Sequence, residues 1–265
     1  MGLLADLRTR ALSLTKELTD NVVDSGDAAV YLRQLLRGNR GDRGDLAPEP
    51  SATGAPTGPP VLVIQGYLAT RGSLHLLERQ LARRGHVVMS FRFGPINLGD
   101  IRDSAGLIAR KVESIVAQTG VTHVDIVGHS MGGLVGLYYV KRLGGRHRVR
   151  RLVMMGTPAR GTWAALAGVV TLGLWSTSSW QLLPRSRFLD ELHQGPIPPD
   201  VEVTTIAAAR DWVVPLQTTR MSGANAVTVP LGHSSLVVSE EVYRRVVNTL
   251  RPPHLDHDDE GPQTD

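Results

Sequence analysis

The stretch "DIVGHSMGG", residues 125–133, places a serine, Ser130, between two glycines directly after an apolar run. Residues 128–132 have the spacing G-x-S-x-G. In this motif the serine occupies a sharp turn between a strand and a helix, and the flanking glycines let neighbouring backbones approach. The pentapeptide alone also occurs by chance, so its meaning depends on the elements around it.

The sequence around this motif alternates apolar segments with amphipathic ones. Because the apolar segments are hydrophobic on both faces, they predict a mostly parallel sheet covered by helices, an α/β fold. The predicted strands are residues 60–66, 86–93, 123–129, 149–158, 201–209 and 224–230. The predicted helices are residues 73–85, 98–120, 132–145 and 239–251.

Two further chemistry-bearing residues follow predicted strands. Asp211 comes after the strand at 201–209, and His233 comes after the strand at 224–230. Reactive groups gather at the carboxyl ends of parallel strands, so Ser130, Asp211 and His233 are expected to meet there. A serine hydroxyl needs a base, and the base needs a group that orients it. The sequence therefore predicts a catalytic triad in the order Ser, Asp, His.

Other acidic and histidine residues are weaker candidates for these roles. Asp125 lies within the strand before Ser130, and Asp190 lies in an insertion. Neither follows a strand end, so Asp211 is favoured as the acid. His129 precedes the serine and is expected to pack or orient the turn.

Two backbone amides are predicted to bind the oxyanion of the tetrahedral intermediate. One is the amide of Met131, directly after the serine, and the other is the amide of Tyr67 in the loop "IQGYLATRG". Gly66 would let this loop turn toward the serine. A simple strand-ending turn is the alternative interpretation of Gln65 and Gly66.

The segments "VLVIQGY", "GHSMGG", "GTPARGT", "DWVVP" and "GHSSL" together resemble the lipase and esterase branch of the α/β-hydrolase family, close to bacterial triacylglycerol lipases. The resemblance covers roughly residues 60 to 250. It implies the α/β-hydrolase fold, a doubly wound sheet with helices on both faces and an inserted helical cap. No cofactor and no metal site are expected, and a structural calcium ion of the kind that some lipases hold is left open. The family usually carries His before the glycine where Gln65 stands here.

The insertion at about residues 160–199 resembles the cap of lipases. It holds Trp163, Trp175 and Trp180 among apolar residues. These tryptophans are predicted to line an acyl pocket or meet a lipid interface, and packing of the cap onto the core is the equal alternative. Lipid or acylglycerol esters are therefore the favoured substrates.

The remaining segments complete the predicted organisation of the 265-residue chain. Residues 1–37 have helical apolar spacing, which includes Val30, Leu32, Leu35 and Leu36, and predict two amphipathic helices. Residues 38–59 predict a Gly/Pro-rich linker, residues 60–251 the hydrolase domain, and residues 252–265 an acidic disordered tail.

Composition narrows the function classes. The chain has no cysteine, which excludes disulfides and thiolate chemistry. Its charge of +4 is mild, and the basic run at 141–151 lacks interleaved aromatic residues, so nucleic acid is not an expected partner. No signal peptide or apolar run of about 18 residues is recognised, which favours a cytoplasmic protein. The N-terminal helices are compatible with peripheral membrane contact, and their packing against the hydrolase core is an alternative of at least equal weight.

These observations predict a carboxylic-ester hydrolase that forms an acyl-enzyme on Ser130. One alternative is an acyltransferase on the same scaffold, which passes the acyl group to an alcohol. A second alternative is a catalytically silent member that binds lipid or a protein partner. An intact triad argues against the silent member, because binding alone does not require three ordered strand-end residues.

Overall fold

The computed structural model describes residues 26–36, 58–91, 93, 97–172 and 176–251. In these residues the six strands form one sheet in the order β2-β1-β3-β4-β5-β6, and every neighbouring pair is parallel. The predicted parallel sheet is thus confirmed. The strands are β1 (Val61–Ile64), β2 (Val88–Ser90), β3 (Val124–His129), β4 (Val149–Met155), β5 (Glu202–Ala208) and β6 (Asn225–Val229).

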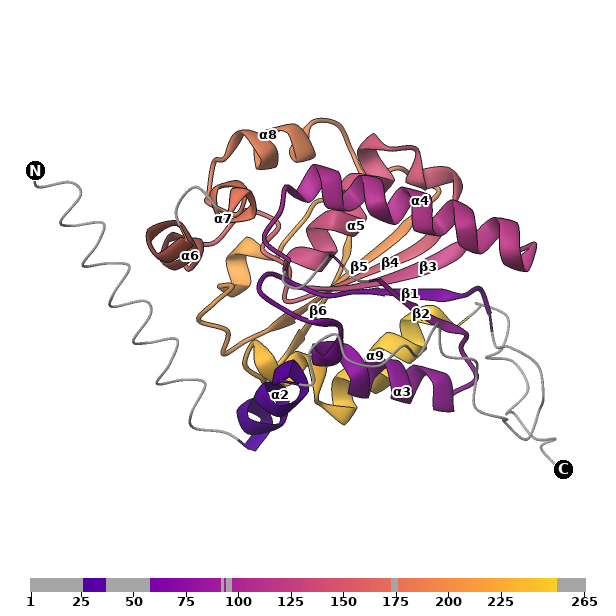
Figure 1. Ribbon diagram of the computed structural model, residues 1–265, viewed down its shortest axis with the longest axis horizontal. Helices are drawn as coiled ribbons and strands as arrows, with labels where there is room; N and C mark the ends of the chain where they lie inside the picture. The colour runs from indigo at the N-terminus through magenta and orange to yellow at the C-terminus, as the bar shows by residue number, and fades with distance from the viewer. Residues whose placement is uncertain (1–25, 37–57, 92, 94–96, 173–175, 252–265) are drawn as a thin grey trace, which may run out of the picture.

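Helices cover both faces of the sheet (Figure 1). The helices α4 and α5 lie on one face, and α3 and α9 lie on the other. The α-helices are α2 (Gly26–Leu36), α3 (His75–Arg83), α4 (Ile101–Thr119), α5 (Met131–Arg142), α6 (Ala165–Leu172), α7 (Thr177–Gln181), α8 (Arg187–His193) and α9 (Glu240–Leu250). The described part of the chain also contains four short 3-10 helices: η1 (Arg71–Leu74), η2 (Gly145–His147), η4 (Leu216–Thr218) and η5 (Ser234–Val237).

The strands divide the interior into two apolar cores. Side chains along a strand alternate between faces, so Leu62 and Ile64 join the core under α4 and α5, whereas Val61 and Val63 join the core over α3 and α9. All four side chains are almost completely buried. This two-sided burial explains why the predicted strands are apolar throughout rather than alternating.

The direction in which successive strands are added to the sheet changes at β1. The chain adds β2 on one side of β1, then returns through α4 to place β3 on the other side. In a doubly wound sheet, the carboxyl ends of the strands at such a reversal border a crevice where ligands bind. The loop after β1 and the turn after β3 therefore begin at the edge where a site is expected.

The structure describes most of the predicted insertion and small parts of the predicted N-terminal segment and linker. The insertion at about 160–199 contains α6, α7 and α8, and α2 falls within the predicted N-terminal helical segment. Most of that segment, most of the 38–59 linker and the tail from 252 lie outside the described residues, as does Trp175. Among the described helices, none has the length and apolar character needed to cross a membrane.

The N-cap of α4 generates a stability prediction. The Asp100 carboxylate accepts a hydrogen bond of 2.7 Å from the amide of Arg102 at the start of α4. Replacing Asp100 with Ala leaves this amide without its cap, which should lower the free energy of unfolding by about 1 kcal/mol. Urea denaturation measures the change. Asp103→Ala, an exposed acidic residue in the same turn, is the control and should cost less; an equal loss in both variants contradicts the capping role.

Candidate active site

Ser130 is the single residue between β3 and α5. Its backbone angles are φ 53° and ψ −124°, and only three described non-glycine residues have a positive φ. Such a conformation is strained for a residue with a side chain. The Ser130 amide donates a 2.8 Å hydrogen bond to the carbonyl of Met155, at the end of β4, which holds the turn against the sheet. The structure therefore places Ser130 in the predicted strand-to-helix turn.

The glycine two residues after Ser130 is required by close packing. A Cβ atom at position 132 would collide with the carbonyl oxygen of Ile64, because the first turn of α5 crosses the end of β1. Any side chain there would push α5 away from the sheet. The glycine of the motif thus allows the strand and the helix to flank the serine at this short distance.

His233 and Asp211 are brought together by the loops after β6 and β5. The His233 Nδ1 atom lies 2.6 Å from Asp211 Oδ2, and the Asp211 side chain is fully buried. The second carboxylate oxygen, Oδ1, accepts hydrogen bonds from the amides of Val213 (2.9 Å) and Val214 (2.7 Å). The carboxylate is therefore fixed, and an Nδ1–H that donates to it leaves His233 Nε2 as a proton acceptor.

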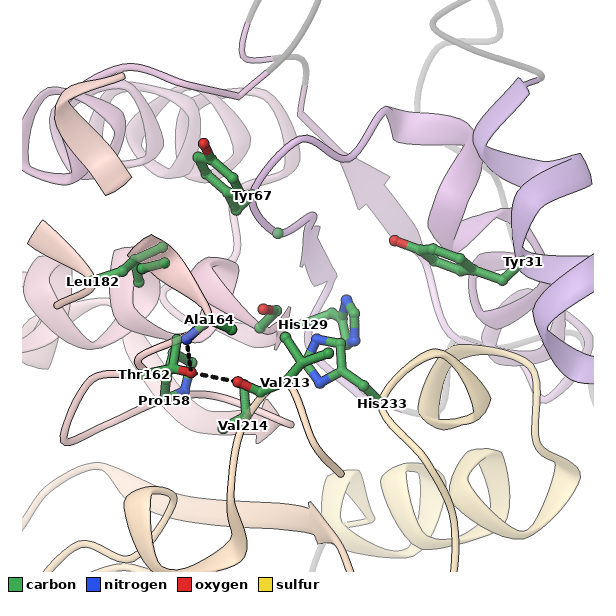
Figure 2. A pocket seen from close by; sticks show the side chains of 13 residues that line it. Tyr31, Tyr67, His129, Pro158, Thr162, Ala164, Leu182, Val213, Val214 and His233 are labelled. Carbon is green, nitrogen blue, oxygen red and sulfur yellow. Dashed lines mark hydrogen bonds between the residues drawn. The ribbon is translucent and has the colours of Figure 1, made fainter. Parts of the chain in front are cut away.

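Ser130 and His233 line one cavity of about 160 Å³ (Figure 2). Asp211 lies behind His233 and does not line it. The other lining residues are mainly apolar and come from α2, the loop after β1, the end of β3, the loop after β4, the cap and the loop after β5. The complete lining is Tyr31, Gly66, Tyr67, His129, Ser130, Pro158, Thr162, Ala164, Ala165, Leu182, Val213, Val214 and His233.

The parallel sheet, the strained serine turn and the strand-end residues identify the architecture, and a family model described as "alpha/beta hydrolase fold" matches residues 59–167. The chain has the α/β-hydrolase fold. This agrees with the resemblance seen in the sequence.

Solved structures show the same fold. Lipase BlEst2 of Bacillus licheniformis in its mature form is similar with a TM-score of 0.65 and 18% identity over 79% of this chain and 97% of that chain. Lipase B of Aspergillus fumigatus has a TM-score of 0.64 and 17% identity over 73% of this chain and 52% of that chain. Monoacylglycerol lipase of Paleococcus ferrophilus has a TM-score of 0.54 and 15% identity over 73% of this chain and 95% of that chain. The chain spans about half the length of the BlEst2 propeptide form, at 53%, and of the Aspergillus enzyme.

The loop after β1 approaches Ser130 closely. A Cβ atom at Gly66 would lie 2.9 Å from the Ser130 Cβ, so the two backbones are in close contact. Among the described residues, the amides of Tyr67 and Met131 make no hydrogen bond to another segment. Both are therefore available to a ligand. The Gln65 side chain, where the family usually carries His, is buried beside this loop.

Tyr31 was not predicted as a site residue. It projects from α2 into the cavity (Figure 2), and burial raises the pKa of its hydroxyl to about 12. The helix is held to η1 and the start of α3, because Thr70 Oγ1 donates to the Leu35 carbonyl (3.0 Å) and the Leu76 amide donates to Gln34 Oε1 (3.1 Å). An N-terminal helix therefore forms one wall of the cavity.

The apolar spacing of α2 does not identify its packed face. Val30, Leu32 and Leu36 are among the exposed large hydrophobic residues, whereas Gln34 is buried against the core. The helix docks through Tyr31, Gln34 and the Leu35 carbonyl rather than through those apolar positions. These apolar positions of the predicted amphipathic helix are therefore exposed, because polar contacts with loops position this short helix.

The other candidates lie away from His233 and Asp211 or outside the cavity. Trp163 and Trp180 are 59% and 50% exposed and do not line the cavity. Asp125 is buried in an ion pair with Arg150, whose Nη2 lies 2.7 Å from Asp125 Oδ2, and Asp190 is exposed on α8. Among the described residues there is no cluster of His, Cys, Asp or Glu able to hold a metal ion.

His129 is completely enclosed next to His233. Neither of its ring nitrogens has a hydrogen-bond partner, and its ring centroid lies 4.8 Å from that of His233. Burial, together with the neighbouring His233, holds the pKa of His129 well below the usual value for histidine. His129 is therefore neutral in the folded protein, and its ring packs against the ring of His233.

This burial generates a pH prediction. The unfolded chain protonates His129 near its ordinary pKa of about 6.5, whereas the folded chain resists protonation. The stabilisation that comes from keeping His129 neutral is therefore complete above about pH 6.5. Below this pH, the free energy of unfolding falls as the pH drops. His129→Phe removes the titrating group, so the fall between pH 7.5 and pH 5 should be smaller by about 1–2 kcal/mol than in the wild type.

Urea denaturation at the two pH values measures this difference. His123→Gln, which replaces an exposed histidine just before β3, is the matched control and should retain the wild-type pH dependence. If His129→Phe loses as much stability as the wild type at pH 5, His129 is not held neutral by folding.

Proposed function

We propose that this protein is a serine hydrolase that cleaves carboxylic esters, with lipid or acylglycerol esters as the substrate class. The observation that carries the proposal is the 2.6 Å contact of His233 Nδ1 with buried Asp211, in a cavity whose wall contains His233 and the strained Ser130. The α/β-hydrolase fold and its lipase neighbours support a hydrolase. A base oriented by a carboxylate beside a serine is the arrangement that acyl transfer requires.

The proposed reaction has two halves. Ser130 Oγ attacks the acyl carbon and its proton passes to His233 Nε2, while the amides of Tyr67 and Met131 bind the oxyanion. His233 then gives this proton to the leaving alkoxide, which departs as an alcohol and leaves an acyl-enzyme. Water attacks the acyl-enzyme with His233 again as base, and the acid is released with free Ser130.

The cavity lining supports an acyl group as the bound portion. Ala164, Ala165, Leu182, Val213 and Val214 contribute apolar surface near Ser130. At about 160 Å³, the cavity is smaller than the roughly 300–1,000 Å³ of typical small-molecule sites. Short acyl chains fit it best, and longer chains must extend past its walls. Exposed Trp163 and Trp180 on the cap favour contact with a lipid interface.

The direct test compares the wild type with Ser130→Ala. Hydrolysis of p-nitrophenyl esters of increasing chain length is measured with and without an oil interface, and labelling by a fluorophosphonate probe is measured in parallel. The wild type should hydrolyse and become labelled, and Ser130→Ala should do neither. Ser234→Ala, a serine beside His233, is the matched control and should be labelled. Equal labelling of the wild type and Ser130→Ala contradicts the proposal.

Transfer to an alcohol would use the same acyl-enzyme. Product analysis with added glycerol therefore distinguishes the two reactions: free acid as the main product supports hydrolysis. A glycerol ester as the main product would identify an acyltransferase instead. Absence of turnover across the whole ester series, with the protein folded, would favour a silent lipid-binding member.

The role of Asp211 generates a second functional prediction. Asp211→Asn replaces the acceptor for the His233 Nδ1–H by an amide, which favours the wrong tautomer of the base. The value of kcat should fall by about 10⁴, with little change in KM. Steady-state kinetics on the best p-nitrophenyl ester provide the measurement. Asp190→Asn, on the exposed face of α8, is the control, and activity that survives in Asp211→Asn at the control's level contradicts the assignment.

Tyr31 generates a prediction about selectivity. Its ring occupies part of a small cavity, so Tyr31→Ala should enlarge the acyl site and move the optimum toward longer chains. One methylene in an apolar site changes selectivity by roughly 10-fold or more, so the shift should be visible in the ratio of kcat/KM between long and short esters. Leu32→Ala, an exposed residue on the same helix, is the control. An unchanged ratio in Tyr31→Ala would show that α2 does not shape the substrate site.

A further inference from the structure

The side chain of Tyr67 ends in a buried cluster of hydroxyl groups in the cap. Its Oη lies 2.6 Å from Ser179 Oγ and 3.2 Å from Ser176 Oγ, and the two serine oxygens are 2.6 Å apart. Ser176 caps α7, and Ser179 lies in its first turn. The hydroxyl groups of Tyr67, Ser176 and Ser179 thus form a hydroxyl triangle. It connects the loop after β1 to a segment more than 100 residues later.

The three hydroxyl protons of the triangle can all be donated within it, and Ser176 Oγ also accepts a hydrogen bond of 3.3 Å from the Ser179 amide. Each hydroxyl has one proton to donate and two lone pairs, so three hydroxyls can form a closed ring in which each donates once and accepts once. Ser176 and Ser179 are completely buried, so bulk water does not compete for them. Hydrogen bonds in such a ring strengthen one another in a medium of low dielectric constant. The Tyr67 hydroxyl is therefore held in one place.

The helix α7 that carries the triangle is itself anchored to the core. Ser178 Oγ donates a 3.0 Å hydrogen bond to the Leu98 carbonyl, and the Gln181 side chain accepts one of 2.8 Å from the amide of Ile101 at the start of α4. The helix α4 in turn packs on α5. The triangle thus has a firm connection to the helices that flank the sheet.

The backbone of the loop after β1 is held less firmly. The Leu68 amide lies 3.4 Å from the Asn97 carbonyl, and the Ala69 amide lies 3.4 Å from the Gly66 carbonyl, both near the upper limit for a hydrogen bond. Leu68 also has a positive φ of 54°, an uncommon conformation for a residue with a side chain. The shortest polar contact of the loop is therefore made by the Tyr67 side chain.

We propose that Ser176 and Ser179 are positioning residues that hold the Tyr67 amide in place for the oxyanion. This inference rests on the proposed function. The cap, through α7, fixes the Tyr67 side chain, and the side chain fixes an amide whose neighbour Gly66 contacts Ser130. The cap thereby braces the loop in which Gln65 replaces the usual His.

The physical consequence concerns the transition state. An oxyanion donor acts when its nitrogen lies about 2.7–3.1 Å from the oxygen on which negative charge develops in the tetrahedral state. The ester carbonyl of the bound substrate depends less on this donor, because the apolar cavity binds the acyl group. Loosening the loop should therefore reduce kcat with little effect on KM.

The experiment uses the full chain and four variants. Tyr67→Phe and Ser179→Ala each open the hydroxyl triangle, and the double variant combines them. Ser186→Ala is the matched control, because it removes a cap hydroxyl that bonds the Gln181 carbonyl and the Leu189 amide but not Tyr67. Steady-state kinetics on the best p-nitrophenyl ester are normalised to the fraction of Ser130 that reacts with a fluorophosphonate at completion. Thermal unfolding checks that each variant is folded.

We expect each single variant to lose about 10-fold in kcat, less than the roughly 10²–10³ of a deleted oxyanion donor, with KM changed less than about two-fold. Because both substitutions break the same connection, the double variant should lose no more than the larger single loss. Ser186→Ala should keep the wild-type kcat even if its melting temperature falls.

Several results would overturn the inference. These are a wild-type kcat in folded Tyr67→Phe, losses that multiply in the double variant, a change in KM rather than kcat, or an equal fall in Ser186→Ala. If Ser179→Ala does not fold, Tyr67→Phe alone decides by the same split between kcat and KM. Absence of Ser130-dependent turnover in the wild type is a separate result, which would overturn the proposed function and the inference with it.

Discussion

The backbone conformation of Ser130 is the constraint on which the site depends. A residue with a side chain at φ 53° and ψ −124° is destabilised by about 1–3 kcal/mol, so the turn persists only because its surroundings hold it. The completely buried strand β3 precedes the turn and the well-buried helix α5 follows it. The Met155 carbonyl of β4 accepts a hydrogen bond from the Ser130 amide. The stability of the parallel sheet thus maintains the local strain that places the serine on the cavity wall.

The groups that surround Ser130 come from separate parts of the chain. Asp211 and His233 follow β5 and β6, and their positions are determined by the sheet. Tyr67 follows β1 but is held by the cap, and Tyr31 comes from α2. The site therefore has a part built on strand ends, to which we assign proton transfer, and a part built on the cap and the N-terminal helix. The second part shapes the cavity and, in our proposal, steadies an oxyanion donor.

The sequence predicted the first part well and the second part incompletely, for a physical reason. A strand, a turn and a helix leave local periodicity, and the carboxyl ends of parallel strands must share one edge, so Ser130, Asp211 and His233 could be named from spacing alone. Tyr31 and the contact of Tyr67 with Ser179 join segments far apart in the chain, for which no periodic signal exists. The sequence marked Val30 and Leu32 as apolar helix positions and Trp163 as a candidate pocket residue. All three are exposed, because a short helix or cap segment can be positioned by its polar contacts.

In our proposal the strained Ser130, its base His233 and two backbone amides form one reactive centre. A crystal structure of the protein after reaction with an alkyl phosphonate tests this directly, because the phosphonyl group has the charge and shape of the tetrahedral intermediate. We expect a covalent bond to Ser130 Oγ, with one phosphonyl oxygen about 2.7–3.1 Å from the amide nitrogens of both Tyr67 and Met131. A phosphonate attached to another residue, or a phosphonyl oxygen directed away from both amides, would contradict it.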